Sequence, residues 1–311
     1  PVRERYKILA ALDRLHAGGS TAGGAGLQLA YTLAEANFDA KAVNRVILAT
    51  DGDFNVGVTH HQALKEMIVR YRKSGIYLSV LGFGYGNYND QLMQALAQNG
   101  NGVAAYIDTL QEAQKVLVEE ASANLFPIAK DVKIQVEFNP EQVAEYRLIG
   151  YETRRLKRED FANDQVDAGE IGAGHRVTAL YEIALTGSAG QRLEPLRYAK
   201  PEAKKQKKGK NHELAFLKIR YKLPDQETSL LISRPVEYTD VVDSLEKVPA
   251  DMRFAAAVAA YGQRLTGGGY LNQFSYDDIV QLALESKGVD PFGYRGEFLG
   301  LVRLTKSLDR K

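Results

Sequence analysis

The sequence contains no cysteine, and this absence removes several classes of protein from consideration. A chain without thiols cannot carry a disulfide scaffold, a thiolate nucleophile or a zinc site with cysteine ligands. The absence does not fix the cellular compartment, because many secreted and periplasmic proteins also lack cysteine.

An excess of charge and a long apolar run are also absent. The chain has 311 residues, and its 40 Lys and Arg nearly balance its 39 Asp and Glu, giving a formal net charge of +1. That balance argues against a general nucleic-acid-binding chain or a disordered one. No window approaches the ~20 apolar residues of a membrane-spanning helix, and no signal peptide is visible. The chain starts at Pro1 directly in a helical pattern, so we expect that its natural start has been removed.

The hydrophobic pattern of the sequence changes near residue 125. Before that point, short apolar runs alternate with helical patterns. Residues 46–50 form a run typical of a strand buried on both faces, and further strands are predicted at 76–81 and 104–107. Strands and helices in alternation predict a parallel sheet covered by helices.

After residue 130 the hydrophobic period changes to two. Val132, Ile134, Val136 and Phe138 alternate with polar residues, which predicts a half-exposed strand. Similar runs cover residues 143–151, 177–185, 214–223 and 229–232. These strands predict a β-sandwich-like domain, and helical patterns return from residue 249. We therefore expect three parts, at residues 1–128, 129–245 and 246–311.

A basic stretch at residues 197–212 lies between two of the predicted strands. Its lysines allow a patch for acidic lipid or nucleic acid. No aromatic interleaving accompanies them, so we favour a solvated hairpin loop. We expect residues 200–211 to be exposed and mobile, and to be the first site of limited trypsin digestion.

The most informative local sequence follows the predicted strand at 46–50. Residues 51–55 read Asp-Gly-Asp-Phe-Asn, and ligand or metal sites of open α/β folds gather at such strand ends. A calcium loop of the EF-hand type is one interpretation, but Val56 replaces the required glycine and a strand precedes the loop. A magnesium-dependent phosphatase of the haloacid dehalogenase type is another, with Asp51 as nucleophile and Asp53 as general acid.

A glycine-rich loop lies about thirty residues before Asp51. Residues 18–25 read Gly-Gly-Ser-Thr-Ala-Gly-Gly-Ala, and Thr21 stands where it can cap a helix or offer its hydroxyl to a ligand. A P-loop is excluded, because no Gly-Lys-Ser/Thr follows. Gly19-Ser20-Thr21 together with Ala49-Thr50-Asp51-Gly52 resembles the von Willebrand factor A domain.

The resemblance implies a Rossmann-like α/β fold with a metal-ion-dependent adhesion site. In such a site Thr21 and Asp51 would be ligands of Mg²⁺ or another divalent cation, since hard oxygen ligands suit these ions. Ser20, Asp53 and Asn55 would lie on the rim. An acidic residue of a partner protein would fill the open coordination position. The implied function is therefore non-enzymatic protein binding or adhesion.

Later segments extend the resemblance to nearly the whole chain. Residues 131–140, 146–151 and 168–181 resemble the C-terminal part of bacterial A-domain proteins that are often predicted lipoproteins. This likeness implies a cell-envelope location, either periplasmic or at the surface.

One departure from the family concerns its first motif, Asp-x-Ser-x-Ser, which does not occur in this sequence. Those residues supply most of the metal's protein ligands, so we expect a truncated A domain whose first strand would precede Pro1. We expect weak or absent Mg²⁺ binding by this chain, and an unpaired strand edge that exposes residues 46–48. A structural domain with a vestigial metal site stays open as a further alternative.

Overall fold

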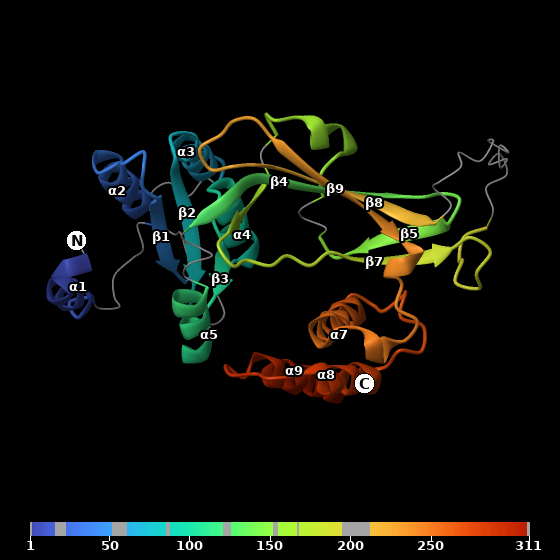
Figure 1. The fold of residues 1–311 in the computed structure, drawn as a ribbon. Coiled ribbons are helices and arrows are strands. Elements are labelled where there is room, and N and C mark those ends of the chain that lie inside the picture. The colour runs from blue at the N-terminus through green and yellow to red at the C-terminus, as the bar shows by residue number, and fades with distance from the viewer. Residues whose placement is uncertain are drawn as a thin grey trace. The chain divides into compact units, whose positions relative to one another are not determined.

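The computed structural model describes residues 2–15, 23–51, 61–84, 88–120, 126–151, 155–166, 168–194 and 212–309. The chain divides into two compact units, Pro1–Phe126 and Pro127–Lys311 (Figure 1). The first unit contains a parallel sheet with helices, and the second contains a β-rich part followed by helices. The fold class predicted from the sequence is therefore confirmed.

Helices and strands alternate along the first unit. In chain order the elements are η1 (Val2–Glu4), α1 (Arg5–Leu12), α2 (Gly23–Ala36), β1 (Asn44–Thr50), α3 (His61–Lys73), β2 (Ile76–Gly82), α4 (Asp90–Asn99), β3 (Ala104–Tyr106), α5 (Leu110–Gln114) and η2 (Lys115–Glu119). The sheet has the order β1-β2-β3, and both strand pairs are parallel. The carboxyl ends of the three strands therefore lie at the same edge of the sheet.

The main core of the first unit lies on one face of this sheet. Alternate apolar residues of β2 are buried there with side chains of α2, α3 and α4. Tyr31 of α2 stacks on Tyr71 of α3, with the ring centroids 4.2 Å apart. On the opposite face, Val116 of η2 packs with Leu81 and Ile107. Helices thus cover both faces where β2 and β3 run.

The outer strand β1 is covered less completely. Among the described strands it pairs with β2 alone. The expectation that Val46 would be exposed is wrong, because its side chain points to the face that α2 covers and is buried in the core. Ile47 points to the other face and is 52% exposed, as expected, so the prediction of a strand buried on both faces is wrong. Helix α1 buries none of its residues.

The second unit begins with two antiparallel sheets. Four strands form one sheet in the order β6-β4-β8-β9, and two form the other, β5-β7. The strands are β4 (Pro127–Phe138), β5 (Val143–Ile149), β6 (Gly169–Gly172), β7 (Leu180–Leu185), β8 (Glu213–Lys222) and β9 (Leu230–Glu237). Sequence reasoning missed β6, because its Gly-Glu-Ile-Gly sequence has a single large apolar residue. Phe138 of β4 stacks on Tyr146 of β5, with centroids 4.4 Å apart, and joins the two sheets.

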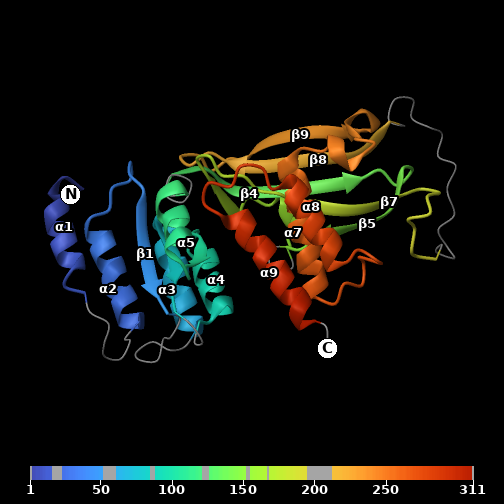
Figure 2. The same ribbon diagram turned by 90° about the horizontal axis from the view of Figure 1, so that it is seen from below.

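Three helices complete the second unit, as the sequence predicts. They are α7 (Ala250–Leu265), α8 (Tyr276–Ser286) and α9 (Tyr294–Leu308), and they pack on one another around buried Ile279 and Val302 (Figure 2). Helix α8 starts at a capping box, in which Ser275 and Asp278 exchange side-chain-to-backbone hydrogen bonds. Short 3-10 helices η3 (Arg158–Ala162), η4 (Tyr238–Asp240) and η5 (Leu245–Lys247) lie in the connections. Within the described ranges, none of the helices combines the length and apolar character needed to cross a membrane.

At Lys133 and Ile134, strand β4 reverses the burial that its sequence predicts. Period-two alternation places Ile134 inward and Lys133 outward, but Ile134 is 41% exposed and Lys133 only 3%. The cause is the segment around η3, whose Asp160 and Asn163 carbonyls accept hydrogen bonds from the Lys133 ammonium. The polar face of β4 is therefore covered at this point by main chain.

Candidate functional site

The ends of β1, β2 and β3 meet at one edge of the parallel sheet. Thr50 pairs with Gly82, and Gly82 pairs with Tyr106. Asp51 follows β1 directly, so it lies where the sequence predicts it, and it is exposed. We call this surface the carboxyl edge, defined by Asp51, Gly82, Phe83, Gly84, Tyr88 and Tyr106.

Two glycines permit close packing beside Asp51. A Cβ on Gly82 would lie 2.0 Å from Cε2 of Tyr88, so the tyrosine ring fills the space that a side chain would need. Gly84 has φ +89°, a conformation that residues with a side chain rarely adopt. A Cβ on Gly84 would lie 3.7 Å from the Cβ of Asp51. The chain leaving β2 therefore passes directly beside the aspartate.

Hydrogen bonds join this chain segment to the strands on both sides. The Phe83 N–H donates to the Thr50 carbonyl at 2.8 Å. The Tyr106 hydroxyl donates to the Gly84 carbonyl at 2.5 Å. Because these bonds connect the ends of β1, β2 and β3, all three strands set the position of Asp51.

Two tyrosines make up the rest of the carboxyl edge. The Tyr88 and Tyr106 rings have centroids 4.7 Å apart. Burial raises the pKa of Tyr88, and the charges of Asp90 and Tyr106 raise it further, so the phenol is neutral at physiological pH. Its buried Oη has no hydrogen-bond partner among the described residues. The edge therefore offers a carboxylate, a neutral aromatic pair and the Phe83 ring, a composition suited to contact with protein.

Most of the predicted site falls outside the described residues. Thr21, Ser20, Asp53 and Asn55 all lie there, so the closeness of Thr21 to Asp51 stays a prediction. The basic stretch at 197–212 also lies outside, apart from its last residue. The structure thus places one of the five predicted site residues, Asp51.

The described residues do not by themselves fit a divalent cation. Mg²⁺ and Ca²⁺ take six or more oxygen ligands. Within the described ranges, no three His, Cys, Asp or Glu residues are grouped as metal ligands. The strand β1 also excludes the EF-hand interpretation, because an EF-hand loop follows a helix.

Sequence reasoning did not single out Tyr88 or Tyr106. Tyr106 is the last residue of β3, so its place at the end of a predicted parallel strand was the available signal. Tyr88 follows the glycine-rich exit from β2, and only the fold shows that its ring packs on Gly82.

Comparison with known families agrees with this architecture. Residues 2–120 match the von Willebrand factor type A domain, which supports a protein-interaction or adhesion-type module. Residues 123–308 match the family described as "Uncharacterized protein YfbK, C-terminal", and the chain belongs to that family. Neither description names a phosphatase.

One curated relative is similar to nearly the whole chain. The chain is 50% identical over 300 residues to "Uncharacterized protein YfbK" of Escherichia coli (strain K12), a match that covers 96% of this chain and 51% of the relative. The chain thus spans about half the length of that curated relative.

Two solved structures are also similar to the chain. The von Willebrand factor type A protein from Catenulispora acidiphila is 16% identical with a TM-score of 0.43, over 94% of this chain and 65% of that one. The conserved hypothetical protein BatB from Bacteroides thetaiotaomicron is 23% identical with a TM-score of 0.26, over 35% and 60%. Both scores are low, and neither likeness bears on function.

Proposed function

We propose that the chain is a non-enzymatic protein-binding module that contacts its partner through the carboxyl edge. The match to a von Willebrand factor type A domain supports the class of function. The choice of surface rests on one observation: hydrogen bonds of Phe83 and Tyr106 fix an edge at which Asp51 and the Phe83 ring are both exposed. A surface held in place before binding loses little entropy when a partner docks.

Two phenylalanines provide a matched test of this surface. Phe83 is 37% exposed at the carboxyl edge, and Phe38 is 42% exposed in the connection from α2 to β1, at the opposite edge of the same sheet. A photoreactive benzoylphenylalanine at position 83 should crosslink a bacterial protein that the same group at position 38 does not. The Asp51→Lys change should reduce that crosslink. Crosslinking from position 38 alone would contradict the choice of edge.

We also propose that a divalent cation, held by Thr21 and Asp51 together with the ligands of an Asp-x-Ser-x-Ser motif, assists partner binding in the way the resemblance implies. The sequence lacks Asp-x-Ser-x-Ser, so this chain has few of the expected ligands and should bind Mg²⁺ weakly or not at all. Titration calorimetry of this chain and of Asp51→Asn should give the same small heats. Tight Mg²⁺ binding that Asp51→Asn leaves intact would show that the site is misplaced.

A cell-envelope location completes the proposal. Its support is the resemblance of residues 131–140, 146–151 and 168–181 to bacterial A-domain proteins that are often predicted lipoproteins. Cell fractionation, followed by detection with an antibody against this chain, checks it. Recovery in the cytosolic fraction alone would contradict this part of the proposal.

A further inference from the structure

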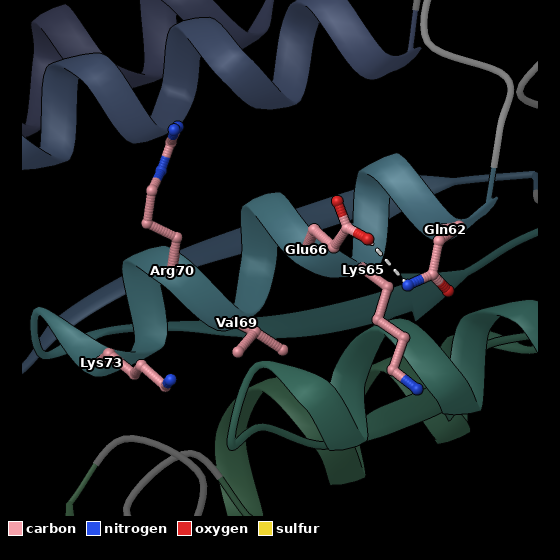
Figure 3. Close-up of a pocket in the computed structure, with 6 residues that line it drawn as sticks. All are labelled: Gln62, Lys65, Glu66, Val69, Arg70 and Lys73. Atoms are coloured by element: carbon pink, nitrogen blue, oxygen red, sulfur yellow. Dashed lines mark hydrogen bonds between the residues drawn. The ribbon is translucent and has the colours of Figure 1, made fainter.

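A shallow groove runs along the solvent side of α3. It is open to solvent, has a volume of about 330 Å³ and is lined by Gln62, Lys65, Glu66, Val69, Arg70 and Lys73 (Figure 3). We call it the α3 groove. Lys65, Val69 and Lys73 follow one another at intervals of four residues, so they form a row along one helix face. Arg70 points to the other side of the helix.

The groove carries positive charge that its surroundings leave unneutralised. Within the described ranges, no carboxylate forms an ion pair with Lys65, Arg70 or Lys73. The single acidic residue of the lining, Glu66, accepts a hydrogen bond from the Gln62 side chain at 2.8 Å. By contrast, two other lysines of this unit are paired: Lys7 lies 2.9 Å from Glu4, and Lys115 lies 3.2 Å from Glu112.

The spacing of the cations restricts what can bind. Lys65 and Lys73 are eight residues apart, which corresponds to about 12 Å along the helix axis. A small anion could contact both ammonium groups only if the two side chains turned toward each other, whereas they extend well apart (Figure 3). A peptide segment can, if its carboxylates are eight residues apart in a helix or four apart in a strand. An apolar side chain between them would rest on half-buried Val69.

We propose that the α3 groove binds an acidic amphipathic segment of another protein. Its recognition elements would be two carboxylates about 12 Å apart with an apolar residue between them. A nucleic acid fits less well, because the lining contains no aromatic side chain for base stacking and the whole chain has a net charge of only +1. The site is distinct from the carboxyl edge, so it does not depend on the function proposed there.

Fluorescence anisotropy with defined probes tests the proposal. The probe is a labelled helical peptide of Ala and Gln with Glu at positions 3 and 11 and Leu at position 7. Its partner peptide has the same composition with the two Glu adjacent, and a third probe is a dT12 oligonucleotide. The full chain should bind the first peptide in preference to both others. Equal binding of the two peptides, tighter binding of dT12 or no binding of the first peptide would each overturn the proposal.

Charge-reversal variants locate the binding site. Lys65→Glu with Lys73→Glu should weaken binding of the first peptide by about tenfold or more, since each lost ion pair becomes a repulsion. The control, Lys7→Glu with Lys41→Glu, changes the net charge equally at exposed positions of the same unit and should alter affinity less than about twofold. The milder pair Lys65→Gln and Lys73→Gln should give an intermediate loss. Equal weakening by the Lys65/Lys73 and control reversals would refute a localised site.

Discussion

A buried ion pair in the second unit gives a quantitative test of the structure. The Lys222 ammonium lies 2.8 Å from Oδ2 of Asp131 and donates to the Asp164 carbonyl at 2.8 Å. Lys222 is 4% exposed, and the Asp131 side chain is 16% exposed. Burial alone would lower the pKa of Lys222, but the hydrogen bond and charge of Asp131, with the charges of Glu227 and Asp164, raise it overall. The group is therefore charged at neutral pH.

The Lys222→Met change keeps the length of the side chain and removes its charge. Among the described residues, the Asp131 carboxylate then keeps one hydrogen bond, which it accepts from the Ala168 N–H at 3.2 Å. Breaking a buried pair on one side costs about 3–5 kcal/mol, and the partial exposure of Asp131 places the expected loss near the lower value. The matched control is Lys247→Met, whose pair with Asp243 is exposed and should contribute about 0.3–0.5 kcal/mol.

Urea unfolding measures both variants. The sequence has no tryptophan, so tyrosine fluorescence and far-UV circular dichroism are the suitable probes, applied to the transition of the second unit. A double-mutant cycle with Asp131→Asn isolates the pair, and asparagine tolerates the positive φ of 53° at that position. The double variant should lose less stability than the sum of the two single changes. Strict additivity, or equal losses for Lys222→Met and Lys247→Met, would refute the buried pair.

Three further predictions concern the carboxyl edge and the helices of the second unit. Gly82→Ala should destabilise the first unit by about 1–3 kcal/mol, because the Tyr88 ring must move. The penalty of Gly82→Ala should be smaller in a chain that also carries Tyr88→Ala, and urea unfolding of the single and double variants checks this. Tyr106→Phe should cost about 1 kcal/mol by removing the bond to the loop after β2, and should increase amide hydrogen exchange there. The hydrogen bond and charge of Arg295 lower the pKa of Asp251. The stability that this pair contributes should therefore be complete above the ordinary pKa of 3.8, and it should disappear as the pH falls through the lowered pKa of the folded state. An acid titration of thermal unfolding should show less of this loss in Asp251→Asn.

Much of the first unit could be predicted because its features follow from linear patterns. A continuous apolar run at residues 46–50 that ends at Asp51 specifies both a strand and the end of that strand. Parallel strands then place successive strand ends at one edge, so the position of Asp51 follows without knowledge of the packing. The exposure of Ile47 was expected only from the missing first strand that the resemblance implies, because a fully apolar strand by itself gives no sign of which face stays uncovered.

The second unit shows where linear patterns fail. Period-two alternation sorts the residues of β4 onto two faces, but it does not say what covers each face. Ile134 lies on the apolar face and is nevertheless 41% exposed, whereas Lys133 on the polar face is 3% exposed. Burial lowers the pKa of Lys133, and the charges of Lys222 and Arg220 add to the effect, while Asp131 and Asp164 oppose it. A lysine in this environment cannot be recognised from its neighbours in sequence.

Buried lysines of the second unit cannot be recognised from sequence because their hydrogen-bond acceptors are mainly main-chain carbonyls. The Lys133 ammonium is bound by the main-chain carbonyls of Asp160 and Asn163, and the Lys222 ammonium by that of Asp164 as well as by the Asp131 carboxylate. Every residue has a main-chain carbonyl, so an acceptor of this kind requires no particular side chain and leaves no motif. The carboxyl edge differs, because it needs a carboxylate at Asp51 and glycines where the Tyr88 ring and a positive φ exclude side chains. The sequence therefore predicts the place of Asp51, while the packing of Tyr88 on Gly82 and the lysines held by main chain are found only in the folded structure.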